Sequence, residues 1–348
     1  MFVLAAIAFT SAAHFYLYKR VLPALFRSPC VAGVAALVFG STLPLGMMGL
    51  LAMNLAPRSA LAPLMICSFS WLGVLYFTLP LALVREVWRP TTASAWPLLA
   101  GLIIAALSAL HATRAPALVE RHIALKGWPS DGYRIVHLSD LHVGTSLRRS
   151  FVQALVTQSN EQHPNLVAIT GDLVDGSPED LLTELEPLRS LTATDGVWFA
   201  LGNHEHLSRA DRWVSAIEGL GVRVLRNAWT RVGPFDLVGI DDLSAAPDFE
   251  LAFAGRDPER FSIALVHQPR ASTEVEAHGG DLQLSGHTHG GQLAPLGFLE
   301  KWDQGCVVGV CRQGALTIHV TAGAGYWGPP MRFFSRAEVA LLVLTAKS

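Results

Sequence analysis

The first 110 residues of this 348-residue chain contain very few charged side chains. They hold six basic residues and one acidic residue, a net charge of +5, whereas the remainder of the chain carries −7. A water-exposed domain usually has a much higher share of charged residues. The chain therefore divides into a part suited to an apolar surrounding and a part suited to water.

Four apolar runs occupy the first part, at residues 1–18, 31–54, 61–84 and 96–113. Each approaches or exceeds the ~20 residues that a helix needs to cross a hydrocarbon core. None has the polar stripe of a soluble helix, which argues against a buried bundle in water. A cleaved signal peptide is disfavoured because the positive charges follow the first run. We therefore expect a transmembrane region of about four helices over residues 1–113.

Basic residues between the runs indicate an orientation. The loops after the first and third runs hold five Lys and Arg residues, whereas the loop after the second run holds only Arg58. Because cytoplasmic loops retain Lys and Arg, we predict a multi-pass protein of the inner (plasma) membrane with its second part on the extracytoplasmic (periplasmic) side. Arg114, Arg121 and Lys126 follow the last run and favour the cytoplasmic face, which stays open.

From about residue 115 the pattern changes to short β-branched and apolar runs, such as YRIVHLSD, NLVAITGD and LQLSGHTH. Runs of this kind are typical of buried strands. Helical windows at 147–162, 177–192 and 209–220 separate the early strands. This alternation predicts a layered α/β domain over residues 131–348. Residues 114–130 are expected to form a linker or a hairpin-like lead-in.

Several of these strands end in residues that can bind metal ions. The candidates are Asp140, His142, Asp172, Asn203, His204, His267, His287 and His289. The carboxyl ends of strands in an open α/β sheet meet at one crevice, so these side chains can converge. Side chains two apart on an extended chain also point to the same side. The number of nitrogen and oxygen ligands fits two ions, about 3.5 to 4 Å apart, better than one.

The motifs DLH, GD, GNHE, H and GHTH, in this order over residues 131–345, resemble the signature of the calcineurin-like metallophosphoesterases. The segments HQPR, GHTHGGQL and GYWGPPMRFFSR resemble the bacterial branch in which a membrane anchor precedes the domain. The resemblance implies an α/β fold, a four-layer α/β/β/α metallophosphoesterase sandwich. It implies that one ion is bound by Asp140, His142, Asp172 and His289, and the other by Asp172, Asn203, His267 and His287. The implied cofactors are two divalent ions, Mn, Fe or Zn, with Mn favoured.

The same resemblance implies a mechanism. Asp172 would bridge the ions, and a hydroxide between them would attack phosphorus in line. His204 would protonate the leaving oxygen, and Asp175 would orient His204. Glycines 286, 290 and 291 would let a tight turn present His287 and His289 to different ions.

Phosphoprotein phosphatases of this superfamily have an arginine where this chain has Gly176, and that arginine binds phosphate in a bidentate manner. We therefore expect phosphodiester or pyrophosphate-type substrates, including lipid-linked ones because of the anchor. Phosphomonoester hydrolysis is the alternative. His206, Tyr326 and Trp327 are candidate substrate contacts, and Tyr326, Trp327, Phe333 and Phe334 form either ordinary core or an apolar lip beside the site.

Other functional classes fit less well. A metal-dependent amidohydrolase normally has His-x-His on its first strand, whereas the first strand here ends in Asp-x-His. A membrane sensor that had lost catalysis would usually lack a ligand or His204. Nucleic acid is not an expected partner, because the second part is acidic. Cys306 and Cys311 form either a hairpin disulfide or two free thiols. His137 and His319 are expected to be packed and hydrogen-bonded.

Overall fold

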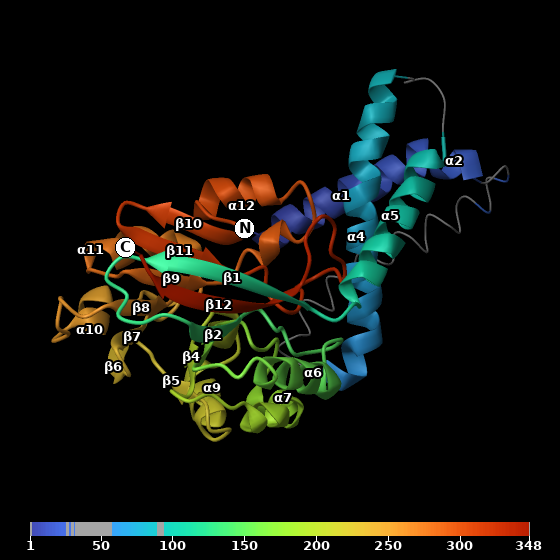
Figure 1. Cartoon of the computed structure of the whole chain (residues 1–348). Coiled ribbons are helices and arrows are strands. Elements are labelled where there is room, and N and C mark those ends of the chain that lie inside the picture. Colours follow the sequence, from blue (N-terminus) through green and yellow to red (C-terminus); the bar gives the residue numbers. More distant parts are fainter. Residues whose placement is uncertain (1, 26–27, 29–30, 32–57, 89–93, 348) are drawn as a thin grey trace. The chain divides into compact units, whose positions relative to one another are not determined.

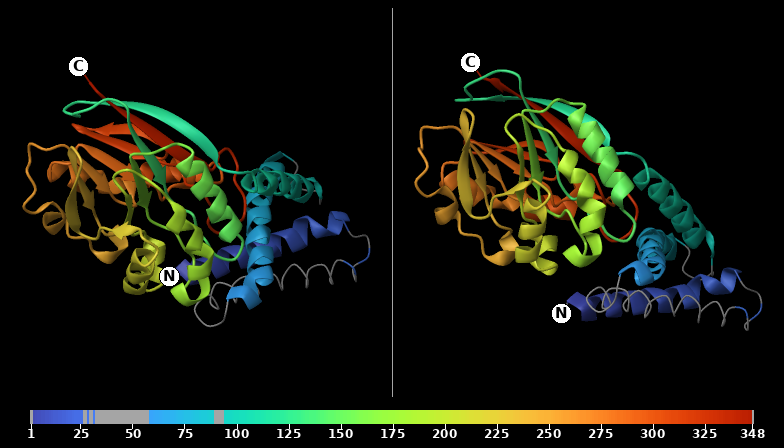
Figure 2. Two further views of the ribbon diagram at one scale, coloured as in Figure 1. Left: turned by 60° about the horizontal axis from the view of Figure 1, so that its bottom comes forward. Right: turned by 90° about the horizontal axis from the view of Figure 1, so that it is seen from below.

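The computed structural model consists of two compact units. The first comprises Met1–Thr113 and Trp327–Met331, and the second comprises Arg114–Tyr326 and Arg332–Ser348. The described residues are 2–25, 28, 31, 58–88 and 94–347. Figures 1 and 2 show the elements of both units.

The first unit is helical. Its helices are α1 (Phe2–Arg20), α2 (Leu22–Leu25), α4 (Arg58–Trp88) and α5 (Trp96–Ala112). Arg20 of α1 donates to Glu86 of α4 over 2.9 Å.

The prediction of about four transmembrane helices is not confirmed. Within the described part of the chain, one segment, Ala62–Trp88 of α4, has the length and apolar composition of a membrane span. Helix α5 is apolar but shorter, and α1 contains residues 2–18 of the first predicted run. The predicted run at 31–54 lies almost wholly outside the described residues.

The second unit contains two six-stranded sheets. The strand order is β1-β12-β2-β3-β4-β5 in the first sheet and β10-β11-β9-β8-β7-β6 in the second. The first sheet comprises β1 (Ala117–Leu125), β2 (Tyr133–Leu138), β3 (Leu166–Thr170), β4 (Val197–Ala200), β5 (Arg223–Val224) and β12 (Glu338–Ala346). The second comprises β6 (Ala228–Val232), β7 (Phe235–Gly239), β8 (Ser262–Leu265), β9 (Leu282–Ser285), β10 (Gly309–Gln313) and β11 (Leu316–Val320).

Helices follow most of the parallel strands, as the alternating pattern predicts. The longer ones are α6 (Arg149–Asn160), α7 (Pro178–Leu185), α9 (Ala210–Glu218), α11 (Ser272–Ala277) and α12 (Gly297–Gln304). Shorter ones are η1 (Glu186–Ser190), α8 (Asn203–Leu207), η2 (Leu243–Ala245), α10 (Phe249–Phe253), η3 (Pro269–Ala271) and η4 (His289–Gly291). The predicted windows at 147–162, 177–192 and 209–220 correspond to α6, to α7 with η1, and to α9.

Alternation along the strands divides the apolar side chains between three cores. Ile135 of β2 packs between the sheets with Phe235 of β7, whereas its neighbour Val136 belongs to a core under α6, α7 and α9. A third core joins the outer face of the second sheet to α10 and α11, through residues such as Val275. The layers are therefore helices, sheet, sheet and helices, as predicted; Figure 1 labels these elements.

The lead-in segment 114–130 differs from the predicted hairpin. It contains β1, which pairs in parallel with β12 through Val119 and Ala340, while β12 pairs antiparallel with β2. Strand β12 is almost fully buried and lies between β1 and β2. β1 is therefore an edge strand of the first sheet, and Figure 1 shows it beside β12.

The aromatic cluster between the sheets gives a test of this core. Phe235 is fully buried, and its ring centroid lies 5.5 Å from those of Trp128 and Tyr133. Phe235→Ala should lower the free energy of unfolding by about 3–5 kcal/mol, because it leaves a cavity between two rigid sheets. Phe298→Ala is the matched control, since that ring is 79% exposed and its removal should cost less than about 0.5 kcal/mol. Equal losses in chemical unfolding would contradict this packing.

Candidate metal centre

Five of the predicted ligands share an uncommon backbone conformation. Asp140, His142, Asp172, His287 and His289 have φ values between 45° and 71°, in the left-handed region. All five lie in the loops that follow strands β2, β3 and β9. The prediction that extended chain directs each i, i+2 pair is therefore wrong, although the side chains do converge. Non-glycine residues persist in this region only where the surroundings hold them, which is common at functional sites.

Glu205 holds one of these strained loops and was not predicted from the sequence. Its fully buried carboxylate accepts backbone N–H bonds from Asp172 (2.9 Å), Leu173 (2.8 Å) and Gly202 (2.8 Å). Burial, followed by the charge of Asp172, raises the pKa of Glu205 to about 7. The signal was present as the last letter of GNHE, but an acidic residue beside a histidine does not reveal that it binds backbone amides.

Two glycines allow the backbone to approach the site carboxylates. A Cβ atom at Gly286 would lie 2.3 Å from Asp140 Oδ2, and one at Gly202 would lie 2.2 Å from Asp172 Oδ1. Both distances are far below van der Waals contact, so a larger residue would displace the carboxylates. Gly286 was predicted to permit a tight turn; the side chains that it accommodates are those of Asp140 and of Ser139, whose Oγ would lie 2.0 Å from such a Cβ.

The side chains form two adjacent groups. In the first, Nε2 of His142 lies 3.1 Å from Nε2 of His289, which is 3.6 Å from Asp140 Oδ1. In the second, His267 Nε2 lies 3.1 Å from Asp172 Oδ2 and 3.2 Å from His287 Nδ1. In each group of three, the ligand atoms lie within 4.8 Å of one another.

Asp172 connects the groups. Its Oδ2 lies 3.8 Å from His142 Nε2 as well as 3.1 Å from His267. His142, Asp172 and His204 also form a third set of converging donors. The structure thus brings together the six His and Asp residues of the two predicted ligand sets, with the carboxylate predicted to bridge them lying between them.

The donor chemistry fits divalent cations. Imidazole nitrogens and carboxylate oxygens converge in a buried space, where they would repel one another without a positive charge. Asn203 supplies an independent observation: within the described residues, its buried Oδ1 has no hydrogen-bond partner. An amide oxygen left unpaired in this way suits a metal ligand, as predicted.

Asp175 fixes the orientation of two imidazoles. Its Oδ1 lies 2.6 Å from His204 Nδ1 and 3.0 Å from His142 Nδ1. With Nδ1–H donated to Asp175, the Nε2 atom of each ring points towards the site. Burial raises the pKa of Asp175, but the two imidazoles outweigh it and hold the pKa far below its usual range.

His204 carries a proton in this surrounding. Burial acts to lower its pKa, but the carboxylates of Asp172 and Asp175 outweigh that effect and raise the pKa to about 9. Its Nε2 lies 3.9 Å from Asp172 Oδ2, at the edge of the two groups. This position suits proton donation to a group held by the same centre.

The predicted substrate contacts lie in different surroundings. His206 Nε2 bonds to the buried Asp241 over 2.5 Å and belongs to neither group. Tyr326 is partly buried, and Trp327, which is 42% exposed, belongs to the first unit. Phe334 is 87% exposed, so it is not a core residue.

His137 and His319 are packed and hydrogen-bonded, as predicted. Both are fully buried, their Nδ1 atoms lie 2.9 Å apart, and His137 Nε2 lies 2.8 Å from Thr170 Oγ1. Because they belong to β2 and β11, they form a polar contact between the two sheets.

Arg332 holds the backbone of His289, a role that was not predicted from the sequence. Its guanidinium is buried and donates to the carbonyl oxygens of His289 (3.1 Å), Ala322 (2.8 Å) and Gly325 (2.6 Å). The motif GYWGPPMRFFSR contains it, but the sequence does not distinguish this arginine from a surface one.

The comparisons with known proteins agree with this geometry. Residues 133–291 match the family model described as calcineurin-like phosphoesterase. A Campylobacter jejuni metallophosphoesterase is 36% identical over 222 residues, which cover 62% of this chain and 59% of that protein. An Aquifex aeolicus metallophosphoesterase is 30% identical over 227 residues, covering 62% of this chain and 85% of that protein.

A longer match extends beyond the α/β unit. A Danio rerio protein named as a transmembrane protein with a metallophosphoesterase domain is 34% identical over 263 residues, covering 70% of this chain and 60% of that protein. The chain thus spans about 60% of the length of the C. jejuni and D. rerio relatives.

Proton release tests whether His267 binds the metal. Burial acts to lower the pKa of His267, but Asp172 outweighs it and raises the pKa to about 10 in the metal-free protein. Below that pH the imidazole is protonated, so a cation must displace the proton. Mn²⁺ binding at pH 7 should release about one proton from His267, and its affinity should rise as pH approaches 10.

Calorimetry in buffers of different ionisation enthalpy measures this release. His267→Gln should abolish the release of that proton. His122 is exposed, so His122→Gln should release it as the wild type does. Metal binding without proton uptake by the buffer would show that His267 is not a ligand.

Proposed function

This chain belongs to the calcineurin-like phosphoesterases, a family of metal-dependent phosphoester hydrolases, and we propose that it is a membrane-anchored dinuclear phosphoesterase acting on phosphodiester or pyrophosphate-type substrates. The observation that carries the proposal is the position of Asp172. One buried carboxylate lies between two groups of imidazole ligands, at 3.1 and 3.8 Å from their nearest nitrogens.

The residues of the two groups would hold two divalent ions. The first ion would take Asp140, His142, Asp172 and His289; the second would take Asp172, Asn203, His267 and His287. When bound, such ions activate water and neutralise charge on a phosphoryl group. The oxygen and imidazole donors suit Mn, Fe or Zn, and we propose Mn.

The chain itself supplies orientation and a proton. Asp175 accepts from His204 Nδ1 over 2.6 Å and thereby directs Nε2 towards the group bound at the centre. The proton of His204 passes to the leaving oxygen as its bond to phosphorus breaks, which removes the negative charge that would otherwise develop there. Asp175 remains ionised and stabilises the imidazolium before transfer.

Gly176 supports the proposed substrate class. This residue offers no guanidinium to a doubly charged monoester, and its carbonyl accepts the indole N–H of Trp213 over 2.8 Å. A phosphodiester, or a pyrophosphate substituted at both ends, carries one negative charge per phosphorus and needs no such clamp. Phosphomonoester hydrolysis is the alternative activity.

A lipid-linked substrate is part of the proposal. The apolar segment Ala62–Trp88 can anchor the chain, and Phe334 exposes an aromatic ring beside the segment that holds His289. The D. rerio relative is named as a transmembrane protein. We place the α/β unit on the extracytoplasmic (periplasmic) side of the inner membrane, supported by the basic loops and by a disulfide, which persists in oxidising compartments.

Hydrolysis of a chromogenic phosphodiester and of the matching monoester tests the proposal. Detergent-purified full-length protein loaded with Mn²⁺ should hydrolyse the diester, and Asp172→Asn should lose both turnover and metal. His204→Ala should lower kcat by about 10²–10⁴ while retaining both ions, because it removes only the proton donor. His122→Ala, an exposed histidine, should behave as the wild type.

Each contrary result would contradict a different part of the proposal. Exclusive monoester turnover would overturn the substrate class. Two bound ions without turnover of either ester would instead favour a sensor with this fold.

A further inference from the structure

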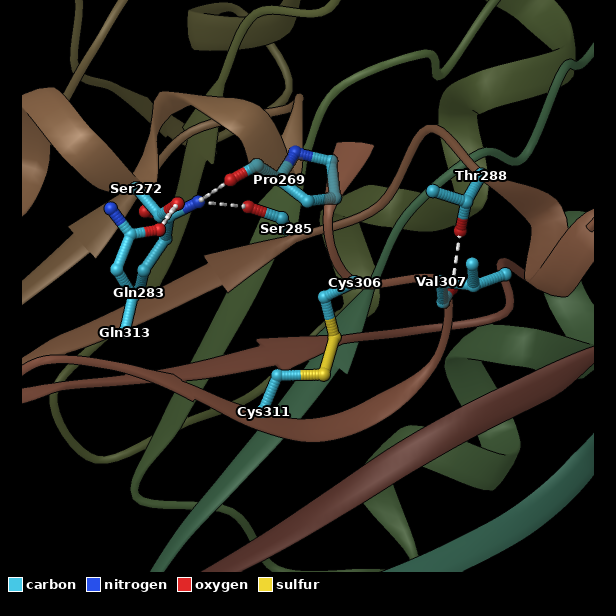
Figure 3. The surroundings of a disulfide bond; sticks show 9 residues. All are labelled: Pro269, Ser272, Gln283, Ser285, Thr288, Cys306, Val307, Cys311 and Gln313. Atoms are coloured by element: carbon cyan, nitrogen blue, oxygen red, sulfur yellow. Dashed lines mark hydrogen bonds between the residues drawn. A yellow bond between two sulfur atoms is a disulfide. The ribbon is translucent and has the colours of Figure 1, made fainter. Parts of the chain in front are cut away.

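The loop closed by the disulfide contacts the residue between two of the proposed metal ligands. Cys306 and Cys311 are bonded, which settles the choice between a disulfide and free thiols, and their bond closes a loop with a sequence separation of 5 (Figure 3). Within that loop, the carbonyl of Val307 accepts the hydroxyl of Thr288 over 2.5 Å. Thr288 is 3% exposed and separates His287 from His289 in the sequence.

The disulfide fixes the position of Val307. Cys306 is buried in the outer core of the second sheet, whereas Cys311 lies on the edge strand β10. Cys311 pairs with Ile318 of β11, and β11 pairs with β9, the strand that leads into the histidine turn. The bond therefore ties the start of the loop to the same sheet that carries the histidines.

Thr288 in turn defines the histidine turn. Its backbone N–H donates to Gly286 over 2.9 Å, and its carbonyl accepts the N–H of Gly291 over 2.7 Å. The side-chain bond to Val307 is its link to another part of the fold. Rotation of Thr288 would alter the direction of both neighbouring imidazoles, whose backbones already have positive φ.

We propose that the loop Cys306–Cys311 positions the metal centre: the disulfide holds the Val307 carbonyl, which holds Thr288 and thereby the directions of His287 and His289. This inference rests on the proposed metal-binding function. His289 has a further fastening, since its carbonyl accepts from Arg332 and from Ser335. His287 is held at its backbone N–H, which donates to the Asp140 carboxylate over 3.1 Å.

The test measures Mn²⁺ affinity and stoichiometry in full-length detergent-purified protein. Thr288→Val removes the hydroxyl and keeps the shape. It should lower the Mn²⁺ affinity of the weaker-binding site by about 10- to 100-fold, as for other residues that support metal ligands. Thr288→Ser retains the hydroxyl and should bind as the wild type. Rescue by serine separates positioning from a general loss of packing.

The double variant Cys306→Ala/Cys311→Ala tests the disulfide. It should also lower the Mn²⁺ affinity of the weaker-binding site. Adding Thr288→Val should produce no further loss of affinity, because both changes break the same chain of contacts. Losses that multiply would overturn the inference, as would normal affinity in Thr288→Val. If the cysteine variant does not fold, the comparison of valine with serine at 288 still decides.

The wild-type titration separates the two proposals. Two Mn²⁺ ions bound to the wild type and to Thr288→Val with equal affinity would overturn only the role of the loop. A wild type that binds no second ion would overturn the dinuclear function itself.

Discussion

The site depends on the burial of the Asp172 carboxylate among three histidines. The side chain is almost inaccessible, and His142, His204 and His267 all approach its Oδ2. A buried carboxylate is stable only with positive charge or hydrogen bonds around it. Protons on His204 and His267, whose pKa values are raised, supply that charge in the metal-free protein, and divalent cations would replace part of it. The fold therefore favours the binding of cations at this position.

The candidate metal centre also depends on a strained backbone. Five ligand-type residues adopt positive φ at the ends of three strands. The fully buried Glu205 and Arg332 hold the loops after β3 and β9 by binding backbone amides and carbonyls respectively. Because these supports bind the main chain, the ligand side chains remain free to face the centre. Rigid sheets on both sides of the interlayer core prevent the loops from relaxing.

Much of this arrangement could be predicted from the sequence. Periodicity identified the strands and helices because burial on both faces imposes continuous apolar runs. The convergence of Asp140 and His289 followed from their positions after strands. The reason given for it was wrong, since the loops are left-handed rather than extended. The supporting roles of Glu205 and Arg332 depend on distant backbone atoms, which no local pattern encodes. The register of β1 with β12 likewise depends on residues more than 200 positions apart.

The central claim is that two cations share Asp172, and electron paramagnetic resonance of the Mn²⁺-loaded protein tests it most directly. Two Mn²⁺ ions about 3.5 to 4 Å apart should be exchange-coupled and give the multiline signal of a dinuclear centre at a stoichiometry of two per chain. Asp172→Asn should abolish the coupled signal. A stoichiometry of one, or two ions with uncoupled six-line spectra, would contradict a shared carboxylate.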